Sequence, residues 1–236
     1  MNIDRNLDSL FEKSEGQVKL ITFVNPFSYY ILKDGPVEVV NEMDHFFADG
    51  IFLVKLNNIL YPRRKISRYS FDFTSLAPIV FDYAIENNFN VAVVGGDSEE
   101  VVRAVEVILM KYPLLNISYF RDGFFSSETE VDEAIENMNE KGINIVLCGM
   151  GTPLQEVFLI KCKLSLKSMK YGYTCGGFLS QIALREDYFN PIMSKFHLRW
   201  LQRAFRHSYV RKRLIKDYPK FLYRFVVERF YHQSSS

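Results

Sequence analysis

The chain has 236 residues and a formal net charge of +1. Hydrophobic residues make up 48 %, charged residues 24 % and aromatic residues 15 %, which are globular proportions and exclude disordered, collagen-like and coiled-coil classes. The net charge averages two unlike parts, because residues 1–194 carry 18 Lys or Arg against 26 Asp or Glu, whereas residues 195–229 carry 11 against two. This asymmetry indicates an acidic body and a basic tail that suits a polyanionic partner.

Five short apolar runs, each followed by a polar or glycine-containing turn, predict β-strands. They are residues 19–24, 91–94, 117–120, 143–148 and 171–175. Runs in which apolar and polar residues do not alternate are typical of strands that are covered on both faces of a sheet.

Helical patterns lie between these strands. Asp97 or Ser98 can cap a helix that Pro113 ends, and residues 127–141 form an acidic helix closed by Gly142. A strand, a tight turn and a helix, repeated, predict parallel β/α units. We therefore expect an α/β fold with a Rossmann-like, mostly parallel sheet flanked by helices and a basic helical appendage at the C-terminus.

Glycines follow four of the predicted strands, at the edge where open α/β sheets bind ligands. Each glycine is either a turn former or part of a turn whose backbone N–H groups hold a phosphate. The turn residues that we single out are Gly95, Gly96, Gly149, Gly151, Thr152, Pro153, Gly176 and Gly177. Leu154 stands where a GxGxxG motif needs its third glycine, so the dinucleotide fingerprint fails, and no Walker A motif is present.

Several polar residues near these turns allow two interpretations. Asp49, in an Asp-Gly turn before an apolar run, is a turn former or a candidate for chemistry, and Asp72 could cap the apolar helix that follows it. Thr152 as N-cap and Gln155 at the third helical position would form a capping box, which is compatible with binding a diphosphate. No Asp-x-Asp pair follows a strand, so the sequence offers no carboxylate site for a metal–diphosphate complex.

Signals for metal binding and targeting are missing from the sequence. The three cysteines and four histidines show no ligand spacing, so we expect no zinc site. The polar N-terminus lacks the apolar region of a signal peptide, and no uncharged apolar run approaches the ~18–20 residues that span a bilayer. We expect a cytosolic chain whose membrane contact, if any, is peripheral.

In combination, these motifs resemble the WecG/TagA/CpsF family of bacterial glycosyltransferases from about Lys19 to Phe230. The most telling block is G-x-G-[AT]-P-x-Q-E at residues 149–156, together with the Trp- and Arg-rich residues 198–203. The other matching pieces are Asn25-Pro26, Asp49-Gly50, Ser70-Phe71-Asp72, Val94-Gly95-Gly96, Gly123-Phe124-Phe125 and Gly176-Gly177-Phe178.

The resemblance implies transfer of a sugar, usually an N-acetylhexosamine, from a UDP-sugar to an undecaprenyl-diphosphate-linked acceptor of cell-surface polysaccharide synthesis. It implies Asp49 as the general base for inversion at the anomeric carbon, and it requires no metal or other cofactor. Asn25, in the turn after the first strand, matches the family motif and is a second catalytic candidate. The family arginine before the Asp72 position aligns without a gap with Ser67, and we take Arg68 as its candidate. The implied substrate-binding set is Asp72, Gln155 and the eight turn residues named above.

The basic tail is the second predicted unit. We expect a UDP-sugar-binding catalytic domain over residues 1–194 and a basic amphipathic helical appendage over residues 195–236. In a helical projection the basic residues lie beside an aromatic and aliphatic face, which is typical of a helix on an anionic membrane. The alternative is an apolar stripe that packs on the body, with solvated arginines. The residues expected to hold the acceptor diphosphate or the membrane are Arg199, Arg203, Arg206, Arg211 and Arg213.

Two other classes stay open at this point. Basic residues interleaved with aromatics also suit a nucleic acid, and a similar sheet could belong to a non-catalytic nucleotide-binding protein. We favour the glycosyltransferase, peripheral on the inner face of the cell membrane. Its expected partners are a UDP-sugar, a polyprenyl-diphosphate-linked acceptor and an anionic membrane, without nucleic acid. The abundant Phe and Tyr would also allow a homo-oligomer.

Overall fold

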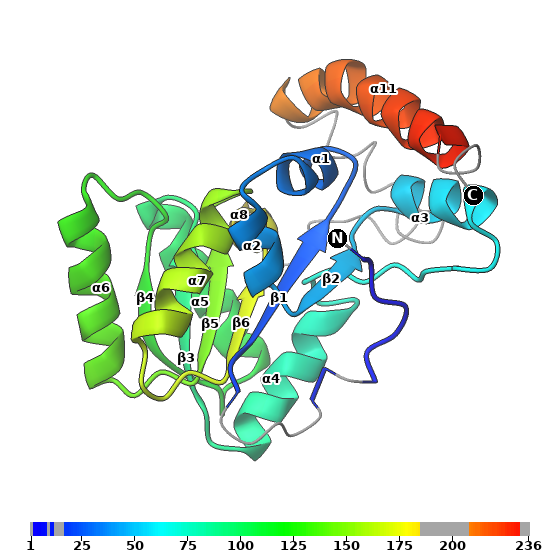
Figure 1. Ribbon diagram of the computed structural model, residues 1–236. Helices are drawn as coiled ribbons and strands as arrows, with labels where there is room; N and C mark the ends of the chain where they lie inside the picture. The colour runs from blue at the N-terminus through cyan, green and yellow to red at the C-terminus, as the bar shows by residue number, and fades with distance from the viewer. Residues whose placement is uncertain (1, 9, 12–16, 185–207, 232–236) are drawn as a thin grey trace.

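The computed structural model describes residues 2–8, 10–11, 17–184 and 208–231. Its centre is a sheet in which every pair of neighbours is parallel, with the strand order β2-β1-β6-β5-β3-β4 (Figure 1). The strands are β1 (Lys19–Val24), β2 (His45–Ala48), β3 (Asn90–Gly95), β4 (Asn116–Arg121), β5 (Ile145–Gly149) and β6 (Tyr171–Thr174). The expected Rossmann-like α/β fold is confirmed.

The strand β2 was not among the five runs predicted from the sequence. It has four residues, and its pairing with β1 runs from Ile21 opposite His45 to Val24 opposite Ala48. So short a run carries little local signal, and it becomes a strand because it extends a sheet that already exists. This strand matters for function because it ends directly before Asp49.

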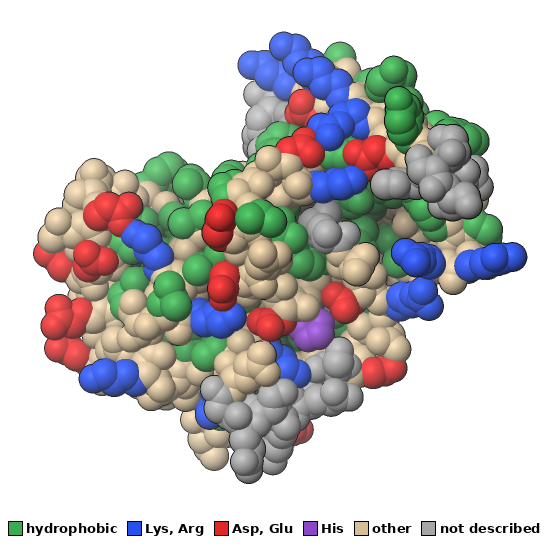
Figure 2. All heavy atoms as spheres, in the orientation of Figure 1, with side chains coloured by type: hydrophobic (Ala, Val, Ile, Leu, Met, Phe, Trp, Pro, Cys, Tyr) green, Lys and Arg blue, Asp and Glu red, His purple; other side chains and the backbone are tan. Residues whose placement is uncertain are grey.

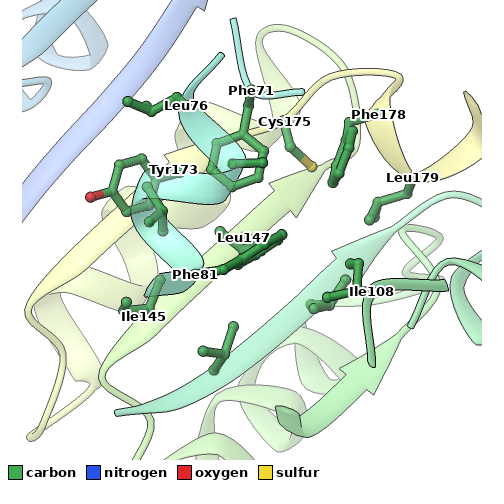
Figure 3. Close-up of a cluster of buried hydrophobic side chains, with 14 of the residues drawn as sticks. Phe71, Leu76, Phe81, Ile108, Ile145, Leu147, Tyr173, Cys175, Phe178 and Leu179 are labelled. Carbon is green, nitrogen blue, oxygen red and sulfur yellow. The ribbon is translucent and has the colours of Figure 1, made fainter. Parts of the chain in front are cut away.

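Helices cover both faces of the sheet. One face is covered by α4 (Leu76–Glu86), α5 (Ser98–Lys111) and α8 (Phe178–Leu184). The other face is covered by α1 (Ser28–Lys33), α2 (Val37–Glu42), α3 (Ile51–Leu60), α6 (Glu128–Glu140) and α7 (Leu154–Ser165). The helix α11 (Ser208–Tyr231) adds Phe221 and Phe225 to the same core from beyond α1 and α3 (Figure 1). Successive strand residues point to opposite faces, so Val93 packs with the α5 layer and Val94 with the α7 layer. Figure 3 shows the first of these two cores around Phe71, Phe81 and Tyr173.

The helix ends agree with the sequence signals where capping residues are present. Asp97 accepts hydrogen bonds from the backbone N–H groups of Glu99 and Glu100, and Glu100 closes a capping box at the start of α5. Ser127 caps α6 by accepting a hydrogen bond from the backbone N–H of Glu130, and Gly142 follows that helix with a φ of +59°. Both predicted helices are confirmed.

The described part of the basic tail is α11, which lies beside α1 and α3 (Figure 1). Phe221 and Phe225 are 1 % and 4 % exposed, and their rings lie 5.6 and 5.4 Å from the ring of Tyr29 in α1. An apolar stripe of this helix therefore packs on the body. Among the described residues, no helix combines the length and apolar character needed to cross a membrane.

Candidate active site at the carboxyl ends of the strands

The turns that follow parallel strands lie along one edge of the sheet. In the strand order, this edge presents Asp49 after β2, Asn25 after β1, Gly176 after β6, Gly149 to Gly151 at the end of β5, and Gly95 at the end of β3. Neighbouring strands are about 4.8 Å apart, so Asp49 and the turn after β5 are separated by about 14 Å. The sheet therefore brings the predicted site residues onto a single edge.

Some of the glycines are required by backbone packing. A Cβ on Gly95 would lie 2.6 Å from the carbonyl oxygen of Gly149, and a Cβ on Gly149 would lie 2.9 Å from the carbonyl oxygen of Gly176. Gly151 differs, because its φ is +81° and, among the described residues other than its chain neighbours, no atom lies within 4 Å of the place where a Cβ would be. Gly95 and Gly149 are thus required for close contact between neighbouring strand ends. Gly151 is not required for such a contact with the described residues.

The Asp49 turn is joined to the turn after β1. The backbone N–H of Asp49 donates to the carbonyl of Val24 at 2.8 Å. Gly50 follows with a φ of +119°, and its missing Cβ would lie 3.8 Å from the Cβ of Asn25. Asp49 and Asn25 are therefore neighbours although 24 positions separate them in the chain.

The side-chain oxygen of Asn25 stabilises the turn that follows β1. This Oδ1 atom accepts hydrogen bonds from the backbone N–H groups of Phe27 and Ser28 at 2.9 and 3.2 Å, which stabilises the turn into α1. The described residues supply no partner for the amide nitrogen of Asn25, which leaves that group for a ligand.

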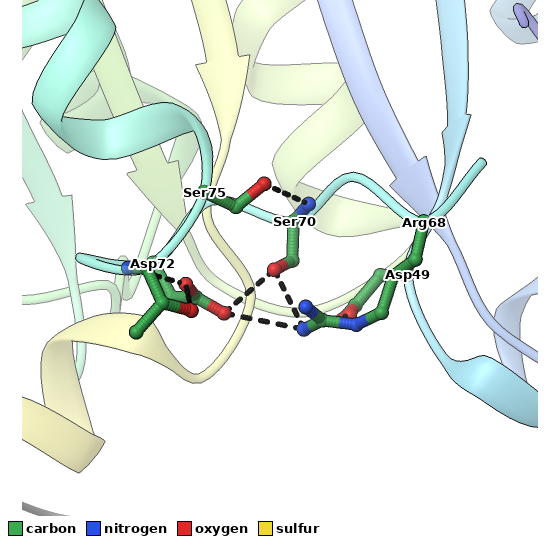
Figure 4. Close-up of polar contacts among 6 residues, drawn as sticks. Asp49, Arg68, Ser70, Asp72 and Ser75 are labelled. Atoms are coloured by element: carbon green, nitrogen blue, oxygen red, sulfur yellow. Dashed lines mark hydrogen bonds and ion pairs between the residues drawn. The ribbon is translucent and has the colours of Figure 1, made fainter. Parts of the chain in front are cut away.

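Arg68 joins Asp49 to a second carboxylate (Figure 4). Its Nη2 lies 3.1 Å from Asp49 Oδ1, 2.7 Å from Ser70 Oγ and 3.2 Å from Asp72 Oδ2. A parallel backbone bridge between Ala48 and Arg68 holds this segment alongside the end of β2. The structure thus places the candidate arginine in contact with Asp49.

The carboxylate of Asp72 pairs with Arg68 and does not cap a helix. This carboxylate accepts hydrogen bonds from the Ser70 hydroxyl at 2.6 Å and from the Thr74 hydroxyl and backbone N–H at 2.6 and 2.8 Å. The helix α4 begins at Leu76 with Ser75 in the N-cap position. The interpretation of Asp72 as the N-cap is wrong, because these local donors and Arg68 occupy its carboxylate three residues too early.

Both partners in this cluster are charged at neutral pH. Burial raises the pKa of Asp72, but hydrogen bonds from Ser70, Thr74 and Arg68 outweigh it and hold that pKa below its usual value. Burial lowers the pKa of Arg68, but the charges of Asp49 and Asp72 outweigh it and leave that pKa above its usual value. Asp49 therefore faces a permanent positive charge.

Replacement of Asp72 by Asn is expected to remove a pH-dependent part of the stability. A carboxyl with a depressed folded pKa stabilises the fold above its unfolded pKa of about 3.9, and this is lost as the pH falls through the folded value. Urea unfolding of wild type and Asp72→Asn, compared from pH 7 to pH 3, should therefore show a difference that holds above about pH 5 and shrinks as the pH falls below about 4. Asp132→Asn, on the exposed side of α6, is the control. A difference that stays constant over this range would contradict the expectation.

A buried acid lies under the turn after β5. Glu156 is 0 % exposed, and its Oε1 accepts hydrogen bonds from the Thr22 hydroxyl at 2.8 Å, the Gln155 amide at 3.1 Å and the Thr152 hydroxyl at 3.2 Å. The capping box predicted for Thr152 is wrong. The Thr152 hydroxyl turns to this carboxylate, while the backbone N–H of Gln155 donates to the carbonyl of Gly151.

The structure adds residues that sequence reasoning missed. No sequence motif gives a role to Thr74 or Thr174, and Glu156 enters the sequence prediction only as the last residue of the 149–156 motif. The position of Glu156 early in α7 suits an exposed carboxylate as well as a buried one. A local pattern does not distinguish the two.

The structure describes the tail arginines only in part. Arg199, Arg203 and Arg206 lie outside the described residues. Arg211 is exposed on α11, and Arg213 belongs to the same helix. Their role toward an acceptor stays a prediction.

The all-parallel sheet with glycine turns and a carboxylate–arginine cluster along one edge is typical of α/β proteins that bind their ligand at the carboxyl ends of the strands. The sequence matches the glycosyl transferase WecG/TagA/CpsF family over residues 2–235. It is 40 % identical over 209 residues to UDP-Gal:alpha-D-GlcNAc-diphosphoundecaprenol beta-1,4-galactosyltransferase of Shigella boydii, covering 89 % of this chain and 86 % of that protein. The chain therefore belongs to the WecG/TagA/CpsF family and is a glycosyltransferase, as the motifs predicted. The nucleic-acid-binding and non-catalytic interpretations are set aside.

Proposed function

We propose that this enzyme transfers a hexose or N-acetylhexosamine from a UDP-sugar to a sugar linked to undecaprenyl diphosphate, with inversion at the anomeric carbon. The observation that carries the proposal is the Asp49–Arg68 contact at the carboxyl edge of the sheet. The name of the Shigella relative states a UDP-Gal donor and a GlcNAc-diphosphoundecaprenol acceptor. UDP-galactose is therefore the first donor to test.

The start of α7 is the better of two helix termini for the diphosphate of the donor. At α5, the carboxylate of Asp97 already accepts the first backbone N–H groups and would repel a phosphate. At α7, no described side chain caps the N-terminus, and no described atom lies within 4 Å of the Cβ position of Gly151 just before it, apart from its chain neighbours. The positive end of the helix dipole favours an anion. A diphosphate held there directs the sugar along the edge toward Asp49.

Asp49 then serves as the general base. Its carboxylate takes the proton from the acceptor hydroxyl as that oxygen attacks the anomeric carbon. The bond between this carbon and the β-phosphate oxygen breaks, and its electron pair leaves with UDP. Arg68 holds the Asp49 carboxylate in place, and the start of α7 stabilises the charge that grows on UDP. The amide nitrogen of Asn25, beside Asp49, is available to a hydroxyl group of either sugar.

A donor screen tests this proposal. Purified enzyme is given UDP-galactose, UDP-glucose, UDP-GlcNAc or UDP-GalNAc with a soluble prenyl-diphosphate–GlcNAc analogue, and UDP release is followed. We expect release that needs both substrates and is fastest with one donor. No release with any donor, or equal release without the acceptor, would contradict the proposed function.

We also propose that α11 rests on the anionic inner face of the cell membrane, where the lipid-linked acceptor is found. Lys and Arg gather along this helix in Figure 2. Lys212, Lys216 and Lys220 are exposed at four-residue spacing, and the exposed rings of Tyr223 and Phe230 lie on the same side of the helix. The opposite side is the one packed on the body. A basic and aromatic outer face supports binding to a membrane surface.

Conversion of these three lysines to Gln is expected to weaken binding to anionic vesicles roughly 100-fold, since each basic residue near such a surface contributes about 1 kcal/mol. Vesicle sedimentation with phosphatidylglycerol measures the effect. The matched control converts Lys141, Lys167 and Lys170, which are exposed at the opposite edge of the sheet. Equal sedimentation of both triple variants would refute a membrane role for α11.

A further inference from the structure

A directed series of hydrogen bonds ends on the buried Glu156. The backbone N–H of Phe23 donates to Thr174 Oγ1 at 3.2 Å, and the Thr174 hydroxyl donates to Thr22 Oγ1 at 3.1 Å. The Thr22 hydroxyl in turn donates to Glu156 Oε1 at 2.8 Å. These bonds connect β6 and β1 to the first turn of α7, so the position of Glu156 is set by the centre of the sheet.

Glu156 in turn sets the side chain next to it. The Nε2 atom of Gln155 lies 3.1 Å from Glu156 Oε1 and 3.2 Å from Thr152 Oγ1. A side-chain amide has two N–H hydrogens and one carbonyl oxygen. Both hydrogens of Gln155 therefore have acceptors, whereas its Oε1 is buried and has no partner among the described residues.

The opposite orientation of this amide is unfavourable. It would place the carbonyl oxygen of Gln155 against Glu156 Oε1, which already accepts from the hydroxyls of Thr22 and Thr152. Burial raises the pKa of Glu156. A proton bound there would sit on Oε2, which has no partner among the described residues, so Oε1 remains an acceptor in either state.

We propose that Glu156 is a positioning residue for donor recognition. Glu156 accepts one hydrogen of the Gln155 amide and a hydrogen bond from Thr152, whose oxygen accepts the other amide hydrogen. Gln155 can then offer only its carbonyl oxygen to an O–H or N–H group of the transferred sugar. Phosphate oxygens are acceptors and cannot pair with that carbonyl, so Gln155 does not hold the diphosphate. An unpaired buried acceptor is costly, and a donor from the ligand removes the cost. Because Oε1 is closed to water, the side chains that cover it move aside when the sugar enters.

The inference rests on the proposed function and is tested first by binding. Calorimetry compares UDP-galactose, or the best donor of the screen, with UDP alone. We expect Gln155→Leu to weaken the donor at least tenfold and UDP less than twofold. Equal weakening of both would overturn the inference, because Gln155 would then hold the nucleotide. If no UDP-sugar binds the wild-type enzyme, the proposed function itself fails.

Kinetics of Glu156 variants test the positioning role. Glu156→Gln keeps a carbonyl oxygen at the Oε1 position, so we expect a KM for the donor within twofold of wild type. Glu156→Met has no acceptor there, and we expect a KM at least fivefold higher with an unchanged inhibition constant for UDP. In a Gln155→Leu background the same Met replacement should have no further effect on KM.

Two results would overturn the role of Glu156. One is a loss of UDP inhibition equal to the loss of donor affinity, which would indicate a collapsed turn. The other is a full additional effect of the Met replacement in the Gln155→Leu background, which would show that Glu156 acts by another route. Melting curves monitor folding. If Glu156→Met does not fold, the Gln155→Leu comparison still decides whether Gln155 contacts the sugar, and a donor KM of Glu156→Gln more than twofold above wild type would contradict the role of Glu156.

Discussion

Asp49→Asn is expected to lower turnover at least a hundredfold while the affinity for the UDP-sugar stays within about twofold. The replacement removes the group that takes the acceptor proton, and general-base catalysis contributes roughly 10²- to 10⁴-fold. An asparagine has nearly the same shape, and its carbonyl oxygen can still accept the hydrogen bond from Arg68 that Asp49 Oδ1 accepts now. Donor binding should be spared, because the start of α7 lies three strands away from Asp49.

Turnover is measured by UDP release at saturating donor and acceptor, and donor affinity by calorimetry. Asp132→Asn, exposed on α6 and outside the cluster of Asp49, Arg68 and Asp72, is the matched control and should keep full activity. Near-normal turnover of Asp49→Asn would show that another group accepts the proton. A parallel loss of donor affinity would instead assign Asp49 to the donor pocket.

Arg68→Gln is the second large effect that we expect. The side chain of Arg68 is 27 % exposed and contacts carboxylates that are 32 % and 16 % exposed, Asp49 and Asp72. Removal of one partner from a largely buried ion pair leaves an uncompensated charge, so the free energy of unfolding should fall by about 3 kcal/mol. Turnover should fall at least tenfold, because nothing then holds the Asp49 carboxylate. Arg68→Lys should restore part of each property, since lysine keeps the charge without the planar fork.

A double variant separates stability from catalysis. In Arg68→Gln with Asp72→Asn, one of the two carboxylates that lost their counter-charge is itself neutral, so part of the lost stability should return in urea unfolding. Turnover should stay low, because Asp49 is still without its arginine. If the double variant regained normal turnover, the role of Arg68 would be structural only.

Much of the fold could be predicted from the sequence because its signals are local. The apolar runs at β3 and β5 need only pairing partners on both sides, and Asp97 with Glu100 marks the start of α5 by a hydrogen-bond pattern within four residues. The family motifs likewise pointed to the glycosyltransferase class and to Asp49. Such features depend on neighbours in the chain, and neighbours are what a sequence displays.

The missed features depend on distant residues. The strand β2 forms because β1 lies beside it. Glu156 is buried because Thr22 in β1 supplies a hydrogen bond from 134 positions away. No window of sequence contains both partners of the Thr22–Glu156 contact, and the capping-box interpretation of Thr152 failed for that reason.

The basic tail shows the same division. The sequence by itself determined that an acidic body continues into a basic, aromatic segment, since charge and composition do not depend on the fold. Only the tertiary structure decided which side of α11 is covered, because Phe221 and Phe225 need the rings of α1 to bury them. It likewise decided which atoms of the edge residues are already occupied, such as the amide hydrogens of Gln155. Hydrogen bonds and burial arise between segments that folding brings together, so the free groups of a site are known only once the chain is folded.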